Sequence, residues 1–376
     1  MMKSILFVCH TNPFSVSFGA EQRTALLLNA FLQNNCKIDI VYVGREQIRS
    51  IPTNPNIRVR LNGVTNYHPS FITKVKFKLC LIPFITCQRI SEFIDKLDKQ
   101  NNYDYIVCRY IDVAELAGLW KHRAKMLLDI DDLPHKAYKS ILHANMMSTK
   151  FRLYLMKSAT NKWIKYAKSC FLPDKKDALK YGVAYFPNIP MIHTDKVVHT
   201  EQNVLFIGRL DWKPNREGLI HFIEICWTKI IEKCPNVKFF VAGKGLSEND
   251  YKLISSYKNI ELLGFVSDIY DFYSKGNIIV APIYSGAGTN IKVIEAMAMA
   301  KACVITPSAT RGFEHILQHE KNAIIVNNDD EFIESVVKLI NDAENVVSLS
   351  KNAMETIGTE YSQAFLNGII KEHIYG

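Results

Sequence analysis

The sequence predicts an α/β protein of two domains, each built on a doubly wound parallel sheet. Short apolar runs alternate along the chain with longer segments of helical period. The runs are apolar along their whole length, as in strands that are buried on both faces. The chain has 376 residues, which is more than one domain of roughly 150 residues needs. Its composition, with 48% hydrophobic and 22% charged residues, is that of a folded globular protein.

Seven apolar runs of strand length occur in the first half of the chain. They cover residues 4–9, 38–43, 57–61, 105–108, 126–130, 169–172 and 184–186. Six further runs occur in the second half. They cover residues 204–207, 238–242, 260–263, 278–281, 303–306 and 323–326. Helical patterns, such as those of residues 20–32 and 85–97, separate many of the runs, so each half is predicted to form a parallel sheet covered by helices.

A polar stretch with two prolines, residues 187–202, interrupts this alternation. We therefore predict a first domain over residues 1–187 and a second over 188–356. The last segment, 357–376, is predicted to be a helix that returns to the first domain. Ligands of open α/β sheets bind at the carboxyl ends of the strands, so a central cleft between the two sheets is the expected site.

The formal net charge of the chain is +9, which suits phosphorylated ligands or an anionic membrane. No nucleic-acid motif is present. No run of about 20 apolar residues is present either, and the first apolar run ends at His10 without a cleavage site. We expect a cytoplasmic protein, with peripheral contact at the inner face of the cell membrane as a further possibility.

The segment 71–87 is the part of the chain that suggests membrane contact. It interleaves Lys74, Lys76 and Lys78 with apolar residues. This pattern is typical of a helix on an anionic membrane surface, and equally of an ordinary amphipathic helix with a solvated lysine face.

The nine cysteines of the chain are scattered, and none forms a CxxC pair. Several lie inside apolar runs. We predict buried, reduced thiols rather than a disulfide framework or a zinc site.

The strongest chemical signal is the glycine-rich loop that follows the 278–281 run. The loop residues are Ser285, Gly286, Ala287, Gly288, Thr289 and Asn290. Free N–H groups at the start of the next helix favour an anion such as phosphate. Lys292 in the first turn opposes the helix dipole, which a bound diphosphate would explain, and Glu295 on the same face would accept two ribose hydroxyls. The alternative is a glycine turn with a capping threonine and a surface Lys–Glu pair.

Three other strand ends in the second half carry glycine. Gly208 is followed by Arg209 and Lys213, two cations that would clamp a diphosphate, or else solvated charges at a turn. Gly243 follows the next strand, and Val266 follows the glycine of the strand after that. Because these strands are parallel, their ends share one edge of the sheet.

The first half has two such junctions. Gly19 and Ala20 lie at a loop-to-helix junction after the first strand, in a sequence that is not GxGxxG. Asp129, Asp131 and Asp132 lie at another strand end. Carboxylates there would hold acceptor hydroxyls, bind a metal, or cap the next helix.

Together these residues resemble the GT-B fold glycosyltransferases, and within them the large retaining family four, in the branch found in bacterial surface-polysaccharide clusters. The motifs GRL, GKG, GFV, the glycine-rich loop and KVIEAMAMA follow the order of that family's donor domain over residues 203–306. FPNIP resembles the family's interdomain PNG segment: Asn188 matches, and Ile189 departs from the glycine.

The resemblance implies a role for each motif. Arg209 would bind the donor diphosphate and Glu295 the ribose, while the amides of the glycine loop would meet sugar and phosphate. Val266 would lie beside the base. Gly19 and Ala20 would approach the donor from the first domain.

Three departures from the family pattern change that assignment. The first glutamate of the family's E-x7-E motif is replaced by Ala287. The position of the family's diphosphate-binding lysine is occupied by Pro214, and Lys213 lies one residue before it. Lys292 is therefore assigned the contact with the diphosphate. A family His-Asp pair corresponds to Asp131-Asp132, so Asp131 is placed near the donor sugar.

The resemblance predicts a metal-independent transferase that needs no cofactor beyond its nucleotide-sugar substrate. Arg209, Lys292 and Asp131 are the predicted catalytic residues, and Asp129 and Asp132 the acceptor-side residues. The predicted acceptor is a saccharide or a lipid-linked saccharide. Three alternatives stay open: a sugar-nucleotide epimerase of the same fold, a dinucleotide-dependent oxidoreductase, and a catalytically silent nucleotide-sugar-binding subunit.

Overall fold

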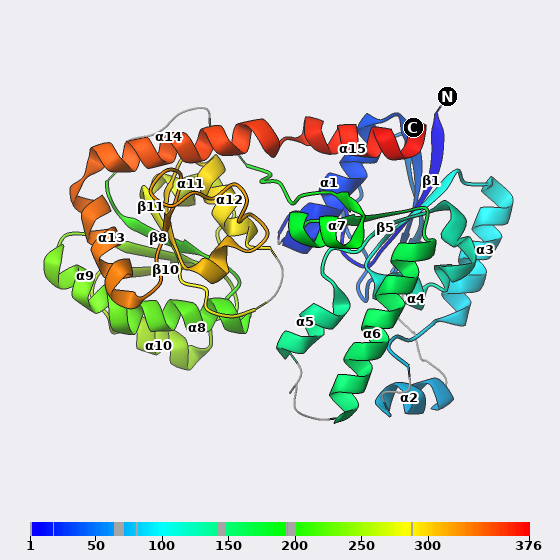
Figure 1. Cartoon of the computed structure of the whole chain (residues 1–376), viewed down its shortest axis with the longest axis horizontal. Coiled ribbons are helices and arrows are strands. Elements are labelled where there is room, and N and C mark those ends of the chain that lie inside the picture. Colours follow the sequence, from blue (N-terminus) through cyan, green and yellow to red (C-terminus); the bar gives the residue numbers. More distant parts are fainter. Residues whose placement is uncertain are drawn as a thin grey trace. The chain divides into compact units, whose positions relative to one another are not determined.

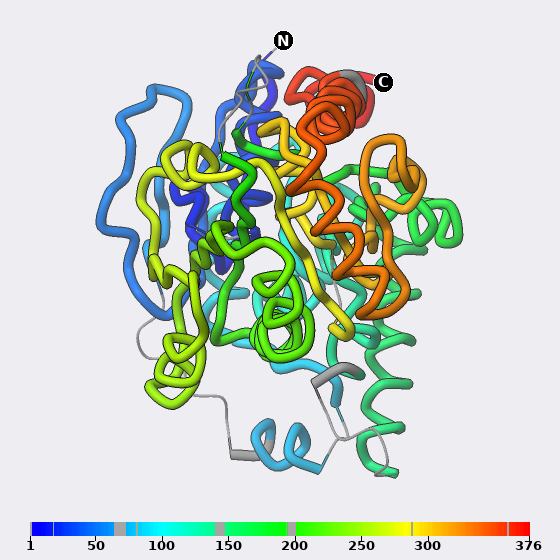
Figure 2. The backbone as a smooth tube through the Cα atoms, turned by 90° about the vertical axis from the view of Figure 1, so that its left-hand side faces the viewer, coloured from blue at the N-terminus to red at the C-terminus, as the bar shows by residue number. Residues whose placement is uncertain are grey.

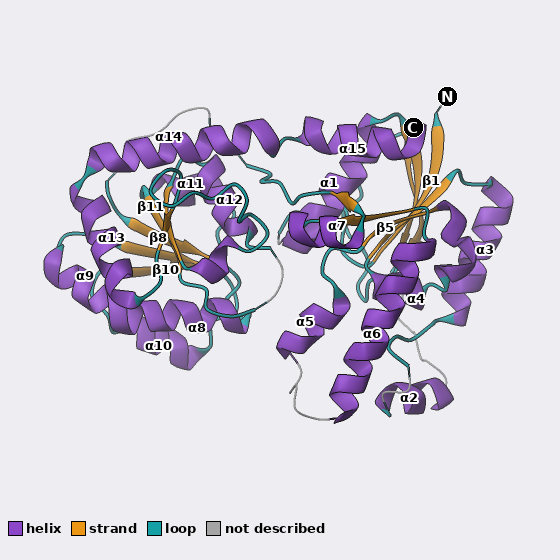
Figure 3. Cartoon of the chain, in the orientation of Figure 1, coloured by secondary structure: helices purple, strands orange, loops and turns teal. Residues whose placement is uncertain are grey.

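The computed structural model describes residues 2–17, 19–63, 71–79, 82–141, 147–192, 194, 201–286 and 289–376. Two compact units make up the chain. Unit 1 contains residues 1–188 and 363–376, and unit 2 contains residues 189–362. In each unit the strands lie at the centre and the helices cover both faces of the sheet (Figure 3). The predicted fold class, two parallel-sheet α/β domains, is confirmed.

Unit 1 is built, within its described residues, on a seven-stranded sheet in the order β3-β2-β1-β4-β5-β6-β7. Every strand pairing described in it is parallel. The strands are β1 (Lys3–Cys9), β2 (Cys36–Tyr42), β3 (Ile57–Asn62), β4 (Tyr105–Arg109), β5 (Met126–Asp129), β6 (Ser169–Leu172) and β7 (Ala184–Tyr185). Each of them matches a predicted apolar run.

Most helices of unit 1 cover this sheet (Figure 1). The helices of the unit are α1 (Gly19–Gln33), α2 (Phe71–Lys78), α3 (Gln88–Asn101), α4 (Ile111–Leu116), the 3-10 helix η1 (Leu119–Lys125), α5 (Pro134–Ile141), α6 (Met147–Tyr166), α7 (Lys175–Tyr181) and α15 (Gln363–Tyr375). Local sequence sets several helix ends. The Asp174 carboxylate accepts the Asp177 N–H at the start of α7, and Gly182 ends that helix in the left-handed region.

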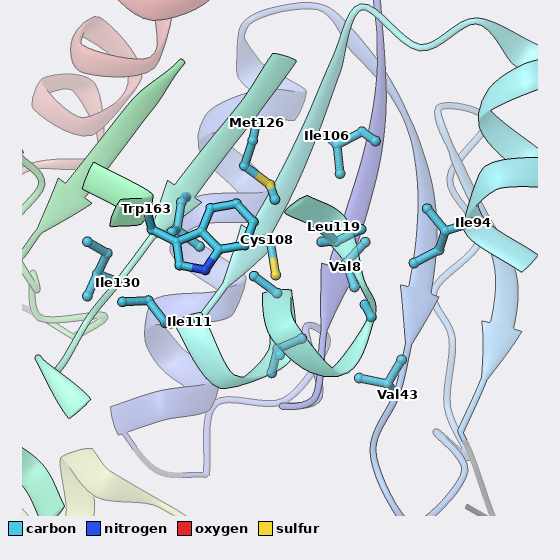
Figure 4. Packing of buried hydrophobic residues seen from close by; sticks show 14 of the residues in the cluster. Val8, Val43, Ile94, Ile106, Cys108, Ile111, Leu119, Met126, Ile130 and Trp163 are labelled. Atoms are coloured by element: carbon cyan, nitrogen blue, oxygen red, sulfur yellow. The ribbon is translucent and has the colours of Figure 1, made fainter. Parts of the chain in front are cut away.

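The core of unit 1 is a cluster of aliphatic residues around Trp163 of α6 (Figure 4). Val8, Ile106 and Met126 enter it from neighbouring strands, and Ile94 from α3. Each of these side chains is fully or almost fully removed from solvent. Burial of this kind is the main favourable term that holds helices on a sheet.

The C-terminal helix α15 packs on α1 in unit 1 (Figures 1 and 2). The Asn34 amide donates to the Asn367 carbonyl oxygen at 2.8 Å, and the Tyr105 hydroxyl donates to the Ile374 carbonyl oxygen at 3.2 Å. The return of the chain to unit 1 was predicted at residue 357. Helix α14 (Ala343–Glu360) spans that position and buries Ile357 in unit 2, so the chain returns to unit 1 only at Gln363.

Unit 2 is built, within its described residues, on a six-stranded sheet in the order β10-β9-β8-β11-β12-β13, whose described pairings are all parallel. The strands are β8 (Val204–Ile207), β9 (Phe239–Ala242), β10 (Ile260–Gly264), β11 (Ile278–Ala281), β12 (Ala302–Ile305) and β13 (Ile324–Ile325). The other elements are α8 (Lys213–His221), the π-helix η2 (Phe222–Trp227), α9 (Thr228–Lys233), α10 (Glu248–Ser255), α11 (Ile269–Ser274), α12 (Ile291–Ala298), the 3-10 helix η3 (Pro307–Thr310), α13 (Asp329–Asn341) and α14.

Eight cysteines lie in the described part of the chain, and all eight are buried, free thiols. Burial raises the pKa of Cys9, Cys170 and Cys303 to about 12, so these thiols are protonated and unreactive near neutral pH. The prediction of reduced core cysteines is confirmed for these eight. Cys80 lies outside the described residues.

Among the described residues, no helix combines the length and apolarity needed to cross a membrane.

Candidate active site

Three of the predicted glycine-bearing strand ends meet at one edge of the unit 2 sheet. The Gly208 N–H donates to the Ala242 carbonyl oxygen at 3.1 Å, and the Gly243 N–H donates to the Gly264 carbonyl oxygen at 2.7 Å. A Cβ atom on Gly243 would lie 1.9 Å from the Gly208 carbonyl oxygen, so only glycine permits this approach. The backbone therefore forms a closely packed floor after β8, β9 and β10.

The glycine-rich loop after β11 leads into α12, as predicted, and the helix begins at Ile291. Gly286 adopts a φ of +107°, which favours glycine. The Asn290 side chain does not cap α12; its amide donates to the Ser308 carbonyl oxygen at 3.0 Å. Ala287 and Gly288 lie outside the described residues.

Arg311, from the segment after β12, holds this loop in place. Its guanidinium donates to the carbonyl oxygens of Gly286 and Ser308, and its own carbonyl oxygen accepts the Asn290 N–H at 3.3 Å. On the same segment, a Cβ atom on Gly312 would lie 2.3 Å from the Thr289 Cγ2 atom. Sequence reasoning missed Arg311, because its three partners are backbone carbonyl and amide groups, which no side-chain pattern reveals.

Lys292 is the cation at the centre of this edge. Its Nζ atom donates to the Asn215 Oδ1 atom at 2.6 Å and lies 5.3 Å from the centre of the Phe206 ring. It also lies only 3.0 Å from where a Cβ atom on Gly208 would stand. Burial lowers the pKa of Lys292 to about 7, and the Glu295 carboxylate opposes that shift.

Asn215 joins Lys292 to the strand end where Arg209 lies, because its amide donates to the Arg209 carbonyl oxygen at 2.9 Å. The Arg209 guanidinium itself is bonded to both oxygens of Asp211, at 3.0 and 2.6 Å. Lys213 is exposed and pairs with Glu217 at 3.5 Å. Asn215 is therefore the side chain that links Lys292 to the Arg209 strand end, while Lys213, predicted to clamp a diphosphate with Arg209, pairs with Glu217 in this structure.

Glu295 is half-buried on α12, and its charge contributes to raising the pKa of Tyr273, after burial itself. The Tyr273 hydroxyl is fully buried and has no hydrogen-bond partner among the described residues. Val266 is half-buried after β10, next to Phe265, whose exposed ring lies 3.8 Å from the Lys244 Nζ atom. Of the two predicted residues, Glu295 thus lies on α12 and Val266 on the segment that follows β10.

The predicted carboxylate cluster of unit 1 divides into a buried and a partly exposed part. Asp129 is fully buried, and its oxygens accept from Arg23 at 2.5 to 3.2 Å and from Arg109 at 2.9 Å. The prediction that Asp129 contacts an acceptor is therefore wrong: two buried guanidinium groups use its oxygens, and no part of it faces solvent. Asp132 is half-buried at the start of the following loop.

Asp131 lies at the rim of this network. Its side chain is 13% exposed, and it bonds to Arg109 and accepts from the Tyr110 hydroxyl at 2.8 Å. Positive φ angles, +56° at Asp131 and +71° at Tyr110, occur at both strand ends. Such angles are uncommon outside glycine and are frequent at functional sites. The exposed His10 ring packs on Tyr110 at 5.0 Å.

The network also fixes the loop-to-helix junction at Gly19 and Ala20. The Arg109 guanidinium donates to the Ala20 carbonyl oxygen, and Gly19 is the first residue of α1. Arg23 donates at 2.9 Å to the Oδ1 atom of Asn188, the matching residue of the FPNIP segment. Sequence reasoning missed Arg23 and Arg109, although an arginine that ends the apolar run YIVCR was an available signal.

Comparisons with known proteins agree with this architecture. Residues 201–342 match a family model described as "Glycosyl transferases group 1". A curated relative, an uncharacterized 44.6 kDa protein in the cps region of Klebsiella pneumoniae, is 26% identical and is matched over 99% of this chain and 100% of its own length.

Solved structures share the fold over the full length. Sucrose-phosphate synthase from Thermosynechococcus elongatus has a TM-score of 0.71 at 14% identity, with 98% of each chain covered. An S. aureus TarM variant in complex with fondaparinux, α-GlcNAc-glycerol and UDP has a TM-score of 0.68 at 12% identity, with 100% of each chain covered. The predicted resemblance to GT-B fold glycosyltransferases is confirmed.

Proposed function

We propose that this chain, which has the GT-B fold and carries a match to the group 1 glycosyl transferases over residues 201–342, moves a sugar from a nucleoside diphosphate to an acceptor hydroxyl. The reaction proceeds with retention of configuration and without a metal. The relative from a cps region supports a role in surface-polysaccharide synthesis, with a saccharide or lipid-linked saccharide as acceptor.

The observation that carries the proposal is the Lys292 network. The Nζ atom of Lys292 lies between the start of α12 and the end of β8, where Asn215 joins it to the Arg209 backbone. The helix start adds free N–H groups and a partial positive charge. This combination suits a diphosphate, which is also the leaving group of the reaction.

The proposed chemistry follows from the positive charge that Lys292 and the start of α12 provide for a diphosphate. The bond between the anomeric carbon of the sugar and the diphosphate oxygen breaks, and the acceptor oxygen forms a bond to the same carbon. Negative charge gathers on the departing diphosphate, which takes the proton of the acceptor hydroxyl. Lys292, Arg209 and the amides of α12 stabilise it, as preoriented donors do for other developing anions. Glu295 accepts the ribose hydroxyls. From unit 1 we assign Asp131 to the sugar and Asp132 to the acceptor.

The test is transfer by purified protein with radiolabelled nucleotide sugars. Arg209→Ala and Glu295→Ala should each lower kcat/KM by 10-fold or more, because a lost hydrogen bond to a charged group costs roughly 1.5–3 kcal/mol. Lys252→Ala, which removes an exposed cation on α10, is the matched control. Unchanged turnover in both site variants would refute the assignment. Sugar release in the absence of acceptor would point to another reaction of the same fold.

We further propose peripheral contact of unit 1 with an anionic membrane through α2 and α6. Lys74, Lys76 and Lys78 are exposed on α2, beside the exposed Leu79. The two helices are joined by Arg152 of α6, which donates to the Phe77 carbonyl oxygen and lies 4.2 Å from the Phe77 ring centre.

Helix α6 adds apolar and aromatic side chains to the same basic surface. Met147, Phe151 and Tyr154 are 84%, 48% and 67% exposed, and Lys150 lies among them. Apolar side chains that enter the interface, together with lysines that attract anionic headgroups, are the features of a surface-bound element. This combination favours a membrane over a merely solvated lysine face.

Vesicle sedimentation tests this contact. The triple variant Lys74→Glu, Lys76→Glu, Lys78→Glu should lose binding to phosphatidylglycerol vesicles, since each lysine near such a surface contributes about 1 kcal/mol. The same charge change at the exposed lysines of α7, Lys175, Lys176 and Lys180, is the control. Equal loss in both triple variants, or no binding by the unmodified protein, would refute the proposed surface.

A further inference from the structure

A cavity of about 340 Å³ lies in unit 2 beside the glycine-rich loop. Its lining residues are Pro214, Glu217, Gly218 and His221 of α8, and Tyr284 and Ser285 of the loop after β11. The volume falls at the lower end of the range of small-molecule sites. A larger hollow of about 410 Å³ lies along β13 and α13, and none of the predicted site residues lines it.

The cavity shares a wall with the diphosphate region. A Cβ atom on Gly286 would lie 3.1 Å from the Pro214 Cγ atom, so the glycine loop rests on the first turn of α8. One residue further on, Asn215 bonds to Lys292. A group attached to a diphosphate at Lys292 therefore has the cavity as its neighbour within the same unit.

Glycine at position 218 brings α8 close to the loop. A Cβ atom there would lie 1.8 Å from the Pro282 carbonyl oxygen, and no L side chain fits in that space. This close contact fixes the spacing between Glu217 on the helix and Ser285 on the loop. The cavity is thus held by packed backbone on both sides.

The polar groups of the cavity suit hydroxyl groups. Glu217 presents a 55% exposed carboxylate, and the His221 imidazole is fixed by the Asp329 carboxylate at 2.9 and 3.0 Å. The Tyr284 ring, 48% exposed, meets the His221 ring edge-on at 5.1 Å. Carboxylates accept hydrogen bonds from hydroxyl groups, and an aromatic ring offers an apolar face to the C–H groups of a sugar.

The charges at the cavity argue against a second phosphate site. Its lining contains the Glu217 carboxylate, and Asp329 stands behind His221. Lys213, one helical turn before Glu217, is already paired with that carboxylate at 3.5 Å. A neutral polyol is therefore favoured over a phosphate.

We infer that this cavity is a saccharide subsite, in which the Glu217 carboxylate and the Tyr284 ring hold a sugar beside the glycine-rich loop. The inference rests on the proposed transferase function. It adds two specificity-determining residues, and the saccharide is either the donor sugar or part of the acceptor.

The test separates sugar recognition from nucleotide recognition. Glu217→Gln and Tyr284→Ala are titrated calorimetrically with UDP and with UDP-glucose, or with GDP and GDP-mannose if the unmodified protein binds those instead. For a donor-sugar subsite, the affinity for the nucleotide sugar falls by 10-fold or more while the affinity for the nucleoside diphosphate is unchanged. For an acceptor subsite, both affinities stay unchanged and the KM for acceptor rises by 10-fold or more.

Glu224→Gln, an exposed carboxylate on the following helical turn, is the matched control and should change none of these values. Unchanged sugar affinity and unchanged acceptor KM in both cavity variants would overturn the inference. Failure of the proposed function has a different signature, since Arg209→Ala would then bind the nucleoside diphosphate as well as the unmodified protein does.

Discussion

Lys292 is expected to couple diphosphate binding to the uptake of a proton. Burial lowers the pKa of this lysine to about 7 in the unliganded protein. A diphosphate bound at the start of α12 would favour the charged ammonium and raise that pKa. The unliganded protein must then gain a proton at Lys292 before or as it binds, and the apparent affinity falls once the pH exceeds 7.

The size of the effect follows from the pKa. If the pKa of Lys292 in the complex lies well above 8.5, the dissociation constant of a nucleoside diphosphate should rise roughly 16-fold between pH 7.0 and pH 8.5. At pH 8 the complex should take up about 0.9 proton. Calorimetric titrations in two buffers of different ionisation enthalpy measure that number directly.

Two variants make the measurement specific. Lys292→Arg keeps its charge at every accessible pH and should bind with a flat profile over this range. Lys301→Met removes another buried lysine, whose pKa is lowered to about 8 by burial and whose Nζ atom bonds to Asn277 at the amino end of the sheet. This control should keep the slope of the unmodified protein.

The same shift has a consequence for stability. The folded-state pKa of Lys292 lies below the usual 10.5, so the unfolded chain binds more protons between about pH 7 and pH 10.5. The unfavourable contribution of Lys292 is therefore fully present below pH 7 and is relieved as the pH rises through that window. Affinity that does not change from pH 7.0 to 8.5, together with no proton uptake at pH 8, would refute the role given to Lys292.

Three further changes test the packing that supports the site. Ala300→Gly should stabilise unit 2 by roughly 0.5–1 kcal/mol, because Ala300 follows α12 with a φ of +52°; chemical denaturation measures this, and a loss of stability would contradict it. Asp129→Asn should destabilise unit 1 by about 3 kcal/mol, since it removes one of the two carboxylates, Asp129 and Asp131, that pair with the buried guanidinium groups of Arg23 and Arg109, and a change below 1 kcal/mol in urea unfolding would show that the network is not needed. Gly218→Ala should lower the melting temperature and weaken nucleotide-sugar binding, because its Cβ atom would meet the Pro282 carbonyl oxygen; a variant with unchanged melting temperature and affinity would disprove that contact.

Hydrophobic pattern alone predicted the order of the strands along the chain, because strands of a covered parallel sheet are apolar on both faces. Residues such as Ile278 and Val304 are buried in the sheet as their runs predict. The ends of the elements were harder to predict. Asn290 precedes α12, and not the threonine considered as a cap, and its side-chain amide bonds to the Ser308 carbonyl oxygen 18 residues away, a partner that the local sequence does not reveal.

In the candidate site, too, the local sequence predicted some features, and others depend on residues that are distant in the chain. Glycines with positive φ, such as Gly286, could be predicted, because few other residues adopt that backbone. The partners of Lys292 and Asp129 could not, since Asn215 and Arg23 lie 77 and 106 residues away in the chain. Spacing in the sequence suggested Lys213 as the second cation, whereas the turn of α8 presents Asn215 to Lys292 and leaves Lys213 on the exposed face.

Arg209 and Lys292, the two cations at this edge, have different surroundings: Arg209 is exposed and paired with a carboxylate, and Lys292 is largely buried and bonded to a neutral amide. This difference bears on how a diphosphate could bind. The Arg209 side chain is 56% exposed, and it is paired with Asp211, whose side chain is 49% exposed. Such a surface pair contributes roughly 0–1 kcal/mol, so a phosphate with greater charge can replace the carboxylate. Lys292 is already fixed by Asn215 in a place where burial disfavours its charge. A diphosphate would thus exchange a weak partner at Arg209 and supply the missing counter-charge at Lys292, so that most of the selectivity for an anion comes from the buried lysine.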